Sequence, residues 1–189
     1  MLVEFIIPTY HRLAPLSSML ASLVAQNNNN WKANVIIDGK DHLDEISKIV
    51  TSFNDLRIKY TVTDDRYNDW GHTPREIGKQ ASDAKYIIMS GDDNYYIPIF
   101  VEELQKASIN NPGLIYWDMV HSHYNYSYFK CHPAFNQIDM GAFATRKDLA
   151  QQIELGKDYA ADGLFIENFK KKFPEQQMIK IDKVLFVHN

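Results

Sequence analysis

Short apolar runs alternate with amphipathic segments along the first half of the chain. Strand-like runs cover residues 2–7, 35–37 and 57–62, and apolar residues recur at helical spacing over 14–26 and 43–53. A polar loop over 64–74 and a helix over 75–84 lead to another apolar run at 86–89. This alternation predicts a mostly parallel sheet with helices on both faces. The predicted fold class is therefore α/β.

The second half of the chain follows a different pattern. After a turn at 95–98, helices are expected at 99–107, 146–155 and 164–172, and strands at 114–120 and 178–187. Residues 121–136 instead alternate histidine and aromatic side chains, as in His121, His123, Tyr124, Tyr126 and Tyr128. This alternation predicts a small antiparallel ribbon or a binding loop. We expect one domain over 1–189, with halves at 1–94 and 95–189.

Composition and charge narrow the class of protein. With 189 residues, 45% of them hydrophobic, the chain can bury the core of one domain. A net charge of −4 with scattered Lys and Arg argues against nucleic-acid binding. The single Cys131 excludes an internal disulfide, and no apolar run approaches the roughly 20 residues of a membrane span. We expect a cytoplasmic protein, and nothing in the sequence indicates its oligomeric state.

Two adjacent carboxylates follow the run at 86–89. Asp92 and Asp93 come after Gly91, which allows a sharp turn, and Asp38 ends the run at 35–37 in the same way. The carboxyl ends of parallel strands share one edge of a sheet, where ligands bind. Carboxylates suit Mg²⁺ or Mn²⁺ and, through the metal, phosphate. An isolated Asp-Asp-Asn is more often a solvated turn, so the metal-site interpretation depends on the rest of the chain.

Other common chemistries find little support. The spacing of His121, His123, Cys131 and His132 matches no closed four-ligand zinc site, which favours aromatic contacts with a substrate or surface packing. Neither a Gly-x-Ser-x-Gly nucleophile motif nor a glycine-rich phosphate loop occurs. What remains is phosphate bound through a metal on Asp92, with a later acid, such as Asp162, as a base.

Several segments spread over the whole chain occur in a recognisable order. They are Phe5-Ile6-Ile7-Pro8-Thr9-Tyr10-His11-Arg12, Val35-Ile36-Ile37-Asp38-Gly39, the positions Asn68, Gly71, Arg75 and Gly78, Tyr86-Ile87-Ile88-Met89-Ser90-Gly91-Asp92-Asp93, Gly141-Ala142-Phe143-Ala144-Thr145-Arg146, and Ala161-Asp162 with a later His188. In this order they resemble the inverting family 2 glycosyltransferases of the GT-A, Rossmann-like fold.

The resemblance implies an activity and its partners. It implies transfer of a sugar from a nucleotide diphosphate sugar, UDP-linked, to a hydroxyl of a glycan or another acceptor, with inversion and with Mn²⁺ or Mg²⁺ as cofactor. Residues 1–94 would form the nucleotide-binding half and residues 95–189 the acceptor side.

The resemblance also assigns roles to individual residues. Asp162 would be the catalytic base, and Asp92 and His188 would bind the metal. The acceptor side would include Met140, Gly141 and Ala142. The implied donor-binding residues are Pro8, Thr9, Tyr10, Arg12, Asp38, Arg75, Ser90, Gly91, Asp92 and Asp93.

Three departures from the family pattern leave alternatives open. Ser90 stands at the usual first Asp of Asp-x-Asp, Ala161 replaces a Glu, and Glu76 replaces the Asn that follows Arg75. A non-catalytic module that binds a nucleotide sugar or carbohydrate is one alternative. A sugar-phosphate nucleotidyltransferase is another, although its glycine-rich N-terminal loop is absent.

Simpler structural roles are open for three of these residues as well. Arg75 would then be a helix-surface charge, His188 a frayed chain end, and Asp162 the N-cap of the following helix. If Asp162 is not the base, Asp158 and Asp139 are the next candidates.

Overall fold

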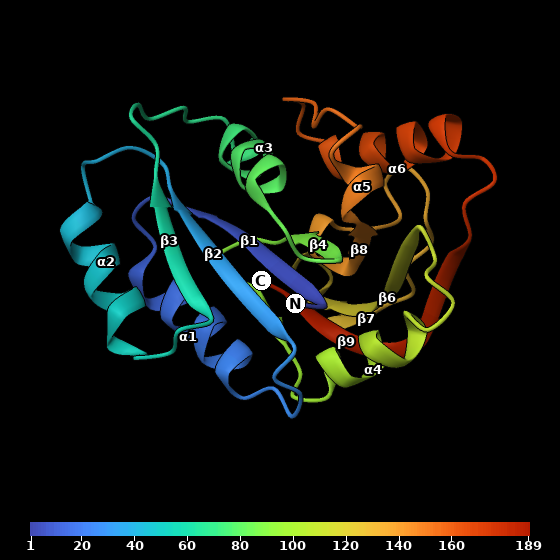
Figure 1. Ribbon diagram of the computed structural model, residues 1–189, viewed down its shortest axis with the longest axis horizontal. Helices are drawn as coiled ribbons and strands as arrows, with labels where there is room; N and C mark the ends of the chain where they lie inside the picture. Colours follow the sequence, from blue (N-terminus) through green and yellow to red (C-terminus); the bar gives the residue numbers. More distant parts are fainter.

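One twisted sheet of nine strands organises the protein in the computed structural model, which describes residues 1–189 (Figure 1). The strand order is β3-β2-β1-β4-β8-β6-β9-β5, and β7 pairs with β6. The strands are β1 Val3–Thr9, β2 Trp31–Ile37, β3 Ile58–Val62, β4 Tyr86–Met89, β5 Tyr95–Tyr96, β6 Leu114–His121, β7 Ser127–Phe129, β8 Phe143–Arg146 and β9 Met178–His188.

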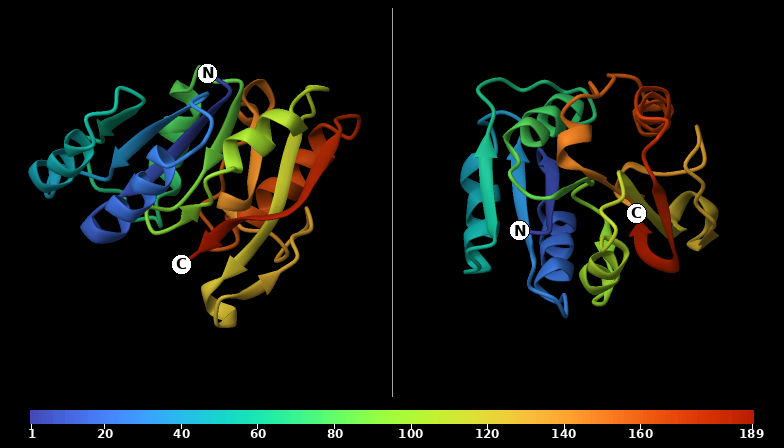
Figure 2. Two further views of the ribbon diagram at one scale, coloured as in Figure 1. Left: turned by 90° about the horizontal axis from the view of Figure 1, so that it is seen from below. Right: turned by 45° about the vertical axis from the view of Figure 1, so that its right-hand side comes forward.

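Helices cover both faces of this sheet. Helices α1, α2 and α4 lie on one face, and α3, α5 and α6 lie on the other (Figures 1 and 2). The helices are α1 Leu13–Val24, α2 Leu43–Ser52, α3 His72–Ala81, α4 Phe100–Ala107, α5 Lys147–Ala150 and α6 Ala161–Lys172, with short 3₁₀ turns η1 Ser122–Tyr124 and η2 Met140–Ala142. None of these helices is long and apolar enough to cross a membrane.

The first half of the sheet is parallel, as its alternating pattern predicts. Strand β1 lies between β2 and β4, and all seven of its residues are buried. The sequence predicts that this strand stops at Pro8, but it continues to Thr9. Proline can continue a strand wherever its missing backbone N–H has no partner to bond. The pairing of β1 with β4 ends at Ile6 and Met89, so β4 offers no acceptor at Pro8.

The second half of the sheet is mixed. Strands β5, β7 and β8 run antiparallel to their neighbours, whereas β6 and β9 are parallel to each other. The ribbon predicted within 121–136 is present as the pairing of β6 with β7, in which His121 faces Ser127. The mostly parallel α/β sheet with a small antiparallel part is therefore confirmed.

Several elements of the second half differ from the prediction. The turn at 95–98 contains strand β5, and residues 143–146 form the buried strand β8. The helix predicted over 146–155 is only the short α5, because residues 153–155 bond back to α3. Helix α6 begins at Ala161, earlier than position 164, with Ala161 buried. Tertiary pairing decides each of these differences, and it leaves little trace in local spacing.

Candidate functional site

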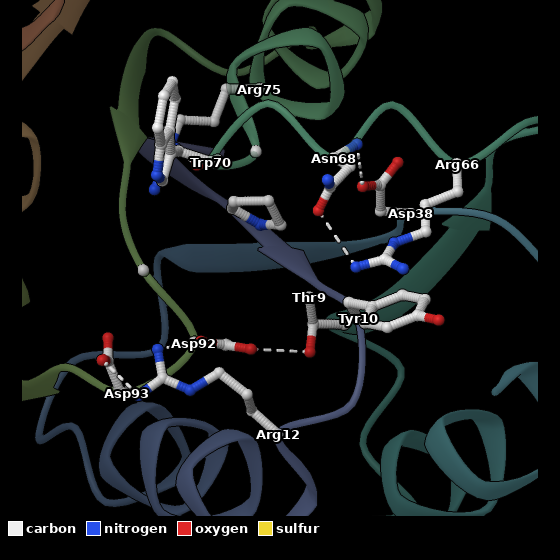
Figure 3. A pocket seen from close by; sticks show the side chains of 13 residues that line it. Thr9, Tyr10, Arg12, Asp38, Arg66, Asn68, Trp70, Arg75, Asp92 and Asp93 are labelled. Carbon is white, nitrogen blue, oxygen red and sulfur yellow. Dashed lines mark hydrogen bonds and ion pairs between the residues drawn. The ribbon is translucent and has the colours of Figure 1, made fainter. Parts of the chain in front are cut away.

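A polar cavity of about 300 Å³ opens at the carboxyl ends of β1, β2 and β4 (Figure 3). Because these strands are parallel, the loops that follow them meet at one edge of the sheet. All of the predicted donor-side residues except Ser90 line it. The lining residues are Pro8, Thr9, Tyr10, Arg12, Asp38, Arg66, Asn68, Trp70, Gly71, Arg75, Gly91, Asp92 and Asp93.

Asp92 and Asp93 share one guanidinium. The hydroxyl of Thr9 donates to Asp92 Oδ2 at 2.7 Å, and Arg12 lies 3.5 Å from Asp92 Oδ1 and 2.7 Å from Asp93 Oδ2. Burial raises the pKa of Asp92, whereas the hydrogen bond from Thr9 and the charge of Arg12 oppose that rise. Arg12 is therefore the guanidinium that pairs with both carboxylates, and the charge of Arg75 also acts on Asp92 and Asp93.

The chemistry of this turn fits a divalent metal. Carboxylate oxygens of Asp92 and Asp93 are the hard ligands that Mg²⁺ and Mn²⁺ prefer. His188 lies elsewhere on the rim, with its Nε2 3.6 Å from Asp139 Oδ2 and its Nδ1 3.3 Å from Ser122 Oγ. Asp92 and His188 do not belong to a group of three ligand atoms within 4.8 Å of one another. The role of His188 as a metal ligand therefore stays a prediction.

His188 is nevertheless an ordered part of the sheet. It pairs with His121 at the end of β9, and the two rings stack with centroids 4.2 Å apart. The next residue, Asn189, donates its backbone N–H to Asn94 at 3.4 Å. The alternative of a frayed chain end is thus wrong, and β9 brings His188 to the same rim as the loop that carries Asp92.

Asp38 organises the loop between β3 and α3. Its two carboxylate oxygens accept the backbone N–H groups of Tyr67 at 2.8 Å and Asn68 at 3.1 Å. The loop then presents Arg66, whose guanidinium lies 3.6 Å from the ring centroid of Tyr10 (Figure 3). The sequence reasoning recognised this segment only as a loop and missed Arg66 as a lining residue.

Trp70 was also missed as a lining residue, although its backbone is unusual. Trp70 has a φ of 56°, a left-handed conformation that is rare for a bulky side chain, and its side chain is 69% exposed. Gly71 follows with a φ of 80°, and a Cβ there would lie 2.7 Å from atoms of Pro8. Such strain persists where surrounding contacts hold it, often at functional sites. The glycine at 71 was the available signal in the sequence.

Arg75 is held toward the cavity by backbone carbonyls. Its Nε donates to the carbonyl of Ser90 at 3.1 Å and its Nη1 to the carbonyl of Trp70 at 2.8 Å. Burial lowers the pKa of this guanidinium, whereas the charges of Asp139, Asp92 and other aspartates oppose that change. Arg75 is therefore no helix-surface charge, and the alternative is wrong.

Ser90 points away from the cavity. It is fully buried, and its hydroxyl lies 3.1 Å from the hydroxyl of Tyr96 and 3.3 Å from Asn94 Nδ2. The Tyr96 hydroxyl also donates to the carbonyl of Gly141 at 2.8 Å. Ser90 thus joins the Asp92 loop to the predicted acceptor-side turn through Tyr96, and it reaches the cavity only through the carbonyl that binds Arg75.

The predicted acceptor-side residues form the buried turn η2. Met140, Gly141 and Ala142 are all buried, and a Cβ at Gly141 would lie 2.5 Å from the ring of Phe186. Asp139 immediately before them accepts the N–H of Gly141 at 2.7 Å and faces His188. Asp139 therefore places its carboxylate next to His188 at the edge of the sheet. The sequence indicated Asp139 only as an alternative candidate for the base.

Asp162 lies in the first turn of α6. Its Oδ1 accepts the N–H of Gly163 at 2.6 Å, and Ala160 occupies the N-cap position. Asp162 as the N-cap is thus wrong, because the helix starts earlier than the spacing predicts. Burial raises its pKa to about 6, the nearby Asp139 adds to the rise, and the N–H of Gly163 and the charge of Arg75 oppose it. A carboxylate of this pKa is ionised at neutral pH and basic enough to take a proton.

Glu76 has a role of its own in this chain. Its Oε2 lies 2.7 Å from Nζ of the fully buried Lys79 and accepts the N–H of Leu155 at 3.0 Å. Lys79 also donates to the carbonyl of Ile153. The pair therefore ties the segment that precedes Asp162 to α3, the helix that carries Arg75. Glu76, which replaces the Asn of the family pattern, is therefore the counterion of the buried Lys79. The sequence spacing did not indicate this ion pair.

Comparison with known proteins decides the family. Residues 4–165 match the family model described as glycosyl transferase family 2. The chain belongs to this family. The resemblance of the ordered segments is confirmed. No curated protein matched the sequence.

Solved structures share the fold of this family 2 chain at low identity. S. aureus TarS 1-349 superposes with a TM-score of 0.82 at 15% identity, over 100% of this chain and 60% of TarS 1-349. The same TarS fragment in complex with UDP-GlcNAc gives 0.78 at 15% identity, over 99% and 58%. Mannosyltransferase PcManGT from Pyrobaculum calidifontis, in complex with GDP-Man and Mn²⁺, gives 0.74 at 14% identity, over 98% and 56%. The chain thus spans less than two thirds of these proteins.

Proposed function

We propose that this family 2 glycosyltransferase transfers a sugar from a UDP-linked donor to a hydroxyl of a glycan or another acceptor, with inversion at the anomeric carbon. The observation that carries the proposal is the polar cavity that joins the Asp92–Asp93 turn to Arg12, Arg66 and Arg75. TarS was solved with UDP and with UDP-GlcNAc, and this chain shares that fold over 99% of its length. A likeness in fold to PcManGT, solved with GDP-Man and Mn²⁺, supports a nucleotide sugar and a metal.

The cavity is suited to a nucleoside diphosphate. Arg75 is held by two carbonyls, so its guanidinium meets a ligand without first being ordered. A planar guanidinium also suits bidentate contact with phosphate oxygens. Tyr10, whose ring is covered by the guanidinium of Arg66, lies across the cavity from Arg75 (Figure 3), and we place the nucleoside there. The first half of the chain, residues 1–94, would then bind the donor.

A divalent cation would be held by Asp92, with Asp93 beside it and His188 as a further ligand in our proposal. When bound, this cation neutralises charge on the departing diphosphate. The protein supplies the remaining neutralisation, because Arg12 and Arg75 lie at the same cavity. Thr9 fixes one oxygen of Asp92, so the other oxygen faces Arg12 and the opening.

The acceptor would approach from the second half of the chain, residues 95–189. Asp162 is the carboxylate that we propose to take the proton of the attacking hydroxyl. The backbone of Met140, Gly141 and Ala142 would form the floor beneath the acceptor, since these residues are buried and joined to the Asp92 loop through Tyr96. Attack from this side, opposite the diphosphate, gives inversion.

One competing function has a specific observation in its favour. Arg12 already pairs with both Asp92 and Asp93, and Ser90 provides no carboxylate to the cavity. A module that binds a nucleotide sugar without turnover would keep these features. The two functions differ in metal dependence and in product formation.

Calorimetry with UDP, with and without Mn²⁺, tests the donor site, and release of UDP from UDP-sugars tests catalysis. We expect UDP binding that strengthens with Mn²⁺ and UDP release that increases with a glycan acceptor. Metal-independent UDP binding without any UDP release would exclude the transferase and leave the non-catalytic binding module as the function. An absence of UDP binding under both conditions would overturn both functions.

A further inference from the structure

A second group of metal-ligand side chains lies outside the cavity. His11 comes from the loop between β1 and α1, His42 is the residue before α2, and Glu45 lies in the first turn of α2. Nε2 of His11 and Nδ1 of His42 each lie 3.4 Å from the same oxygen, Oε2 of Glu45. The three ligand atoms all lie within 4.8 Å of one another. This arrangement brings together two segments that are far apart in the sequence.

The two nitrogen-to-oxygen separations match those of a tetrahedral metal centre. Zinc binds histidine nitrogen and carboxylate oxygen at about 2.0 to 2.2 Å, so neighbouring ligand atoms on a tetrahedron lie roughly 3.3 to 3.6 Å apart. Two histidines and one glutamate form a known zinc ligand set that leaves a fourth position for water. Imidazole ligands also suit nickel and copper. The ligands of this group, two imidazole nitrogens and one carboxylate oxygen, therefore differ from the carboxylate oxygens at Asp92 and Asp93.

One of the three ligands, His42, is packed in place before any metal arrives. The ring of Tyr10 packs edge-on against His42, with centroids 4.8 Å apart at 83°, and the Tyr10 hydroxyl donates to Asp41 at 3.2 Å. Helix α2 fixes the backbone of Glu45, whose side chain is 54% exposed. The His11 ring stacks on His42, with centroids 3.8 Å apart at 13°, and its side chain is 51% exposed. Coordination requires this exposed ring to rotate out of the stack, because the in-plane lone pairs of two parallel rings cannot point at one ion.

We propose that His11, His42 and Glu45 form a second metal site, which binds a zinc-class transition-metal ion. The site is separate from the cation expected at Asp92. It joins the β1–α1 loop to the start of α2, and these two loops supply Tyr10, Arg12 and Asp38 to the cavity. Metal at this site would brace the Tyr10 wall of the cavity from behind.

A Co²⁺ titration followed by calorimetry and visible absorption tests the site, with Co²⁺ alone as the probe for a zinc-class ion. The full chain with Asp92→Asn is used so that the proposed donor-site cation does not contribute. We expect one Co²⁺ per chain with the intense absorption of a four-coordinate centre. His11→Ala and Glu45→Gln in that background should weaken binding by roughly 100-fold or more.

His132→Ala is the matched control. His132 is an exposed histidine of the second half whose side chain makes no hydrogen bond in the structure, so its loss should leave Co²⁺ binding unchanged. In the parent protein, Zn²⁺ at about 100 times its Kd should raise Tm by roughly 5 °C or more, and Glu45→Gln should abolish the rise. Equal Co²⁺ affinity in all the variants, or no binding in the Asp92→Asn protein, would overturn the proposal. Because His11 and Glu45 are exposed, both variants should fold, which the Tm without metal verifies.

Discussion

The two sides of the candidate site differ in how their charged groups are partnered. On the side formed by β1, β2 and β4, Asp38 accepts two backbone N–H groups, Arg12 pairs with both aspartates, and Arg75 is held by two carbonyls. On the side formed by β6, β9 and α6, the contact of His188 with Asp139 is 3.6 Å long, and Asp162 bonds only to the N–H of its neighbour.

In the proposed function, this difference separates donor binding from proton transfer. A cavity whose charges are already ordered binds a charged ligand without reorganisation. A carboxylate that is buried beside another acid, with few donors, has a raised pKa and accepts a proton more readily. Changes on the first side should therefore alter donor affinity, and changes on the second side should alter the rate.

The largest expected effect comes from Asp162→Asn. A base acts in the transition state, so transfer should slow by roughly 10²- to 10⁴-fold while the Kd for UDP stays nearly unchanged. Single-turnover transfer and calorimetry measure the two quantities. Glu167→Gln is the matched control, since Glu167 is an exposed acid on the same helix. Wild-type turnover in Asp162→Asn would remove Asp162 as the base and direct attention to Asp158 and Asp139.

Asp92→Asn should act on the opposite side of the comparison. The strengthening of UDP binding by Mn²⁺ should be lost, because the proposed cation loses a charged oxygen ligand. Burial already raises the pKa of Asp92, so the neutral side chain should cost far less stability than the roughly 2 kcal/mol or more of a core lesion. Calorimetry and denaturant unfolding are the measurements, and Asp64→Asn, at a 94% exposed side chain, is the control. Unchanged metal dependence would contradict the assignment.

Glu76→Gln tests the connection between the two sides. Lys79 is fully buried, so loss of its counterion should cost about 2 kcal/mol of unfolding free energy. The double variant Glu76→Gln/Lys79→Met should lose less, because it leaves no unpaired charge. Denaturant unfolding measures both, with Glu154→Gln, an exposed glutamate of the same segment, as the control. Equal stability of Glu76→Gln and Glu154→Gln would show that the ion pair does not hold this segment.

The smallest expected effect is a pH dependence of transfer. Asp162 has a pKa of about 6, above its usual value, and must be ionised to act as a base. At saturating donor, the rate should be level above about pH 7, reach half its maximum near pH 6, and fall roughly tenfold per unit at lower pH. A raised pKa in the folded state also means that the stability from this group is present below pH 3.8 and is lost as the pH rises toward 6. A rate that stays level down to pH 4.5 would be inconsistent with this role.

The sequence was most informative where chemistry lies next to a strand end. Asp38 follows an apolar run directly, and Asp92 and Asp93 come two residues after another such run. Because parallel strands share one edge, the meeting of these residues at the cavity was predictable. Arg66 and Trp70 lie in a loop whose course depends on two hydrogen bonds to Asp38, an acid roughly 30 positions earlier in the chain. No local spacing indicates such a contact.

By itself, the sequence determined the α/β class, the parallel first half and the family, since each depends on local periodicity or on ordered motifs. Only the tertiary structure decided that Ser90 turns inward to Tyr96, that Glu76 neutralises Lys79, and that His11 meets His42 and Glu45. The physical reason is common to all three. In each case the contact or the burial of the side chains arises only when separate elements pack together. That packing depends on the whole buried core, and the local sequence pattern does not specify it.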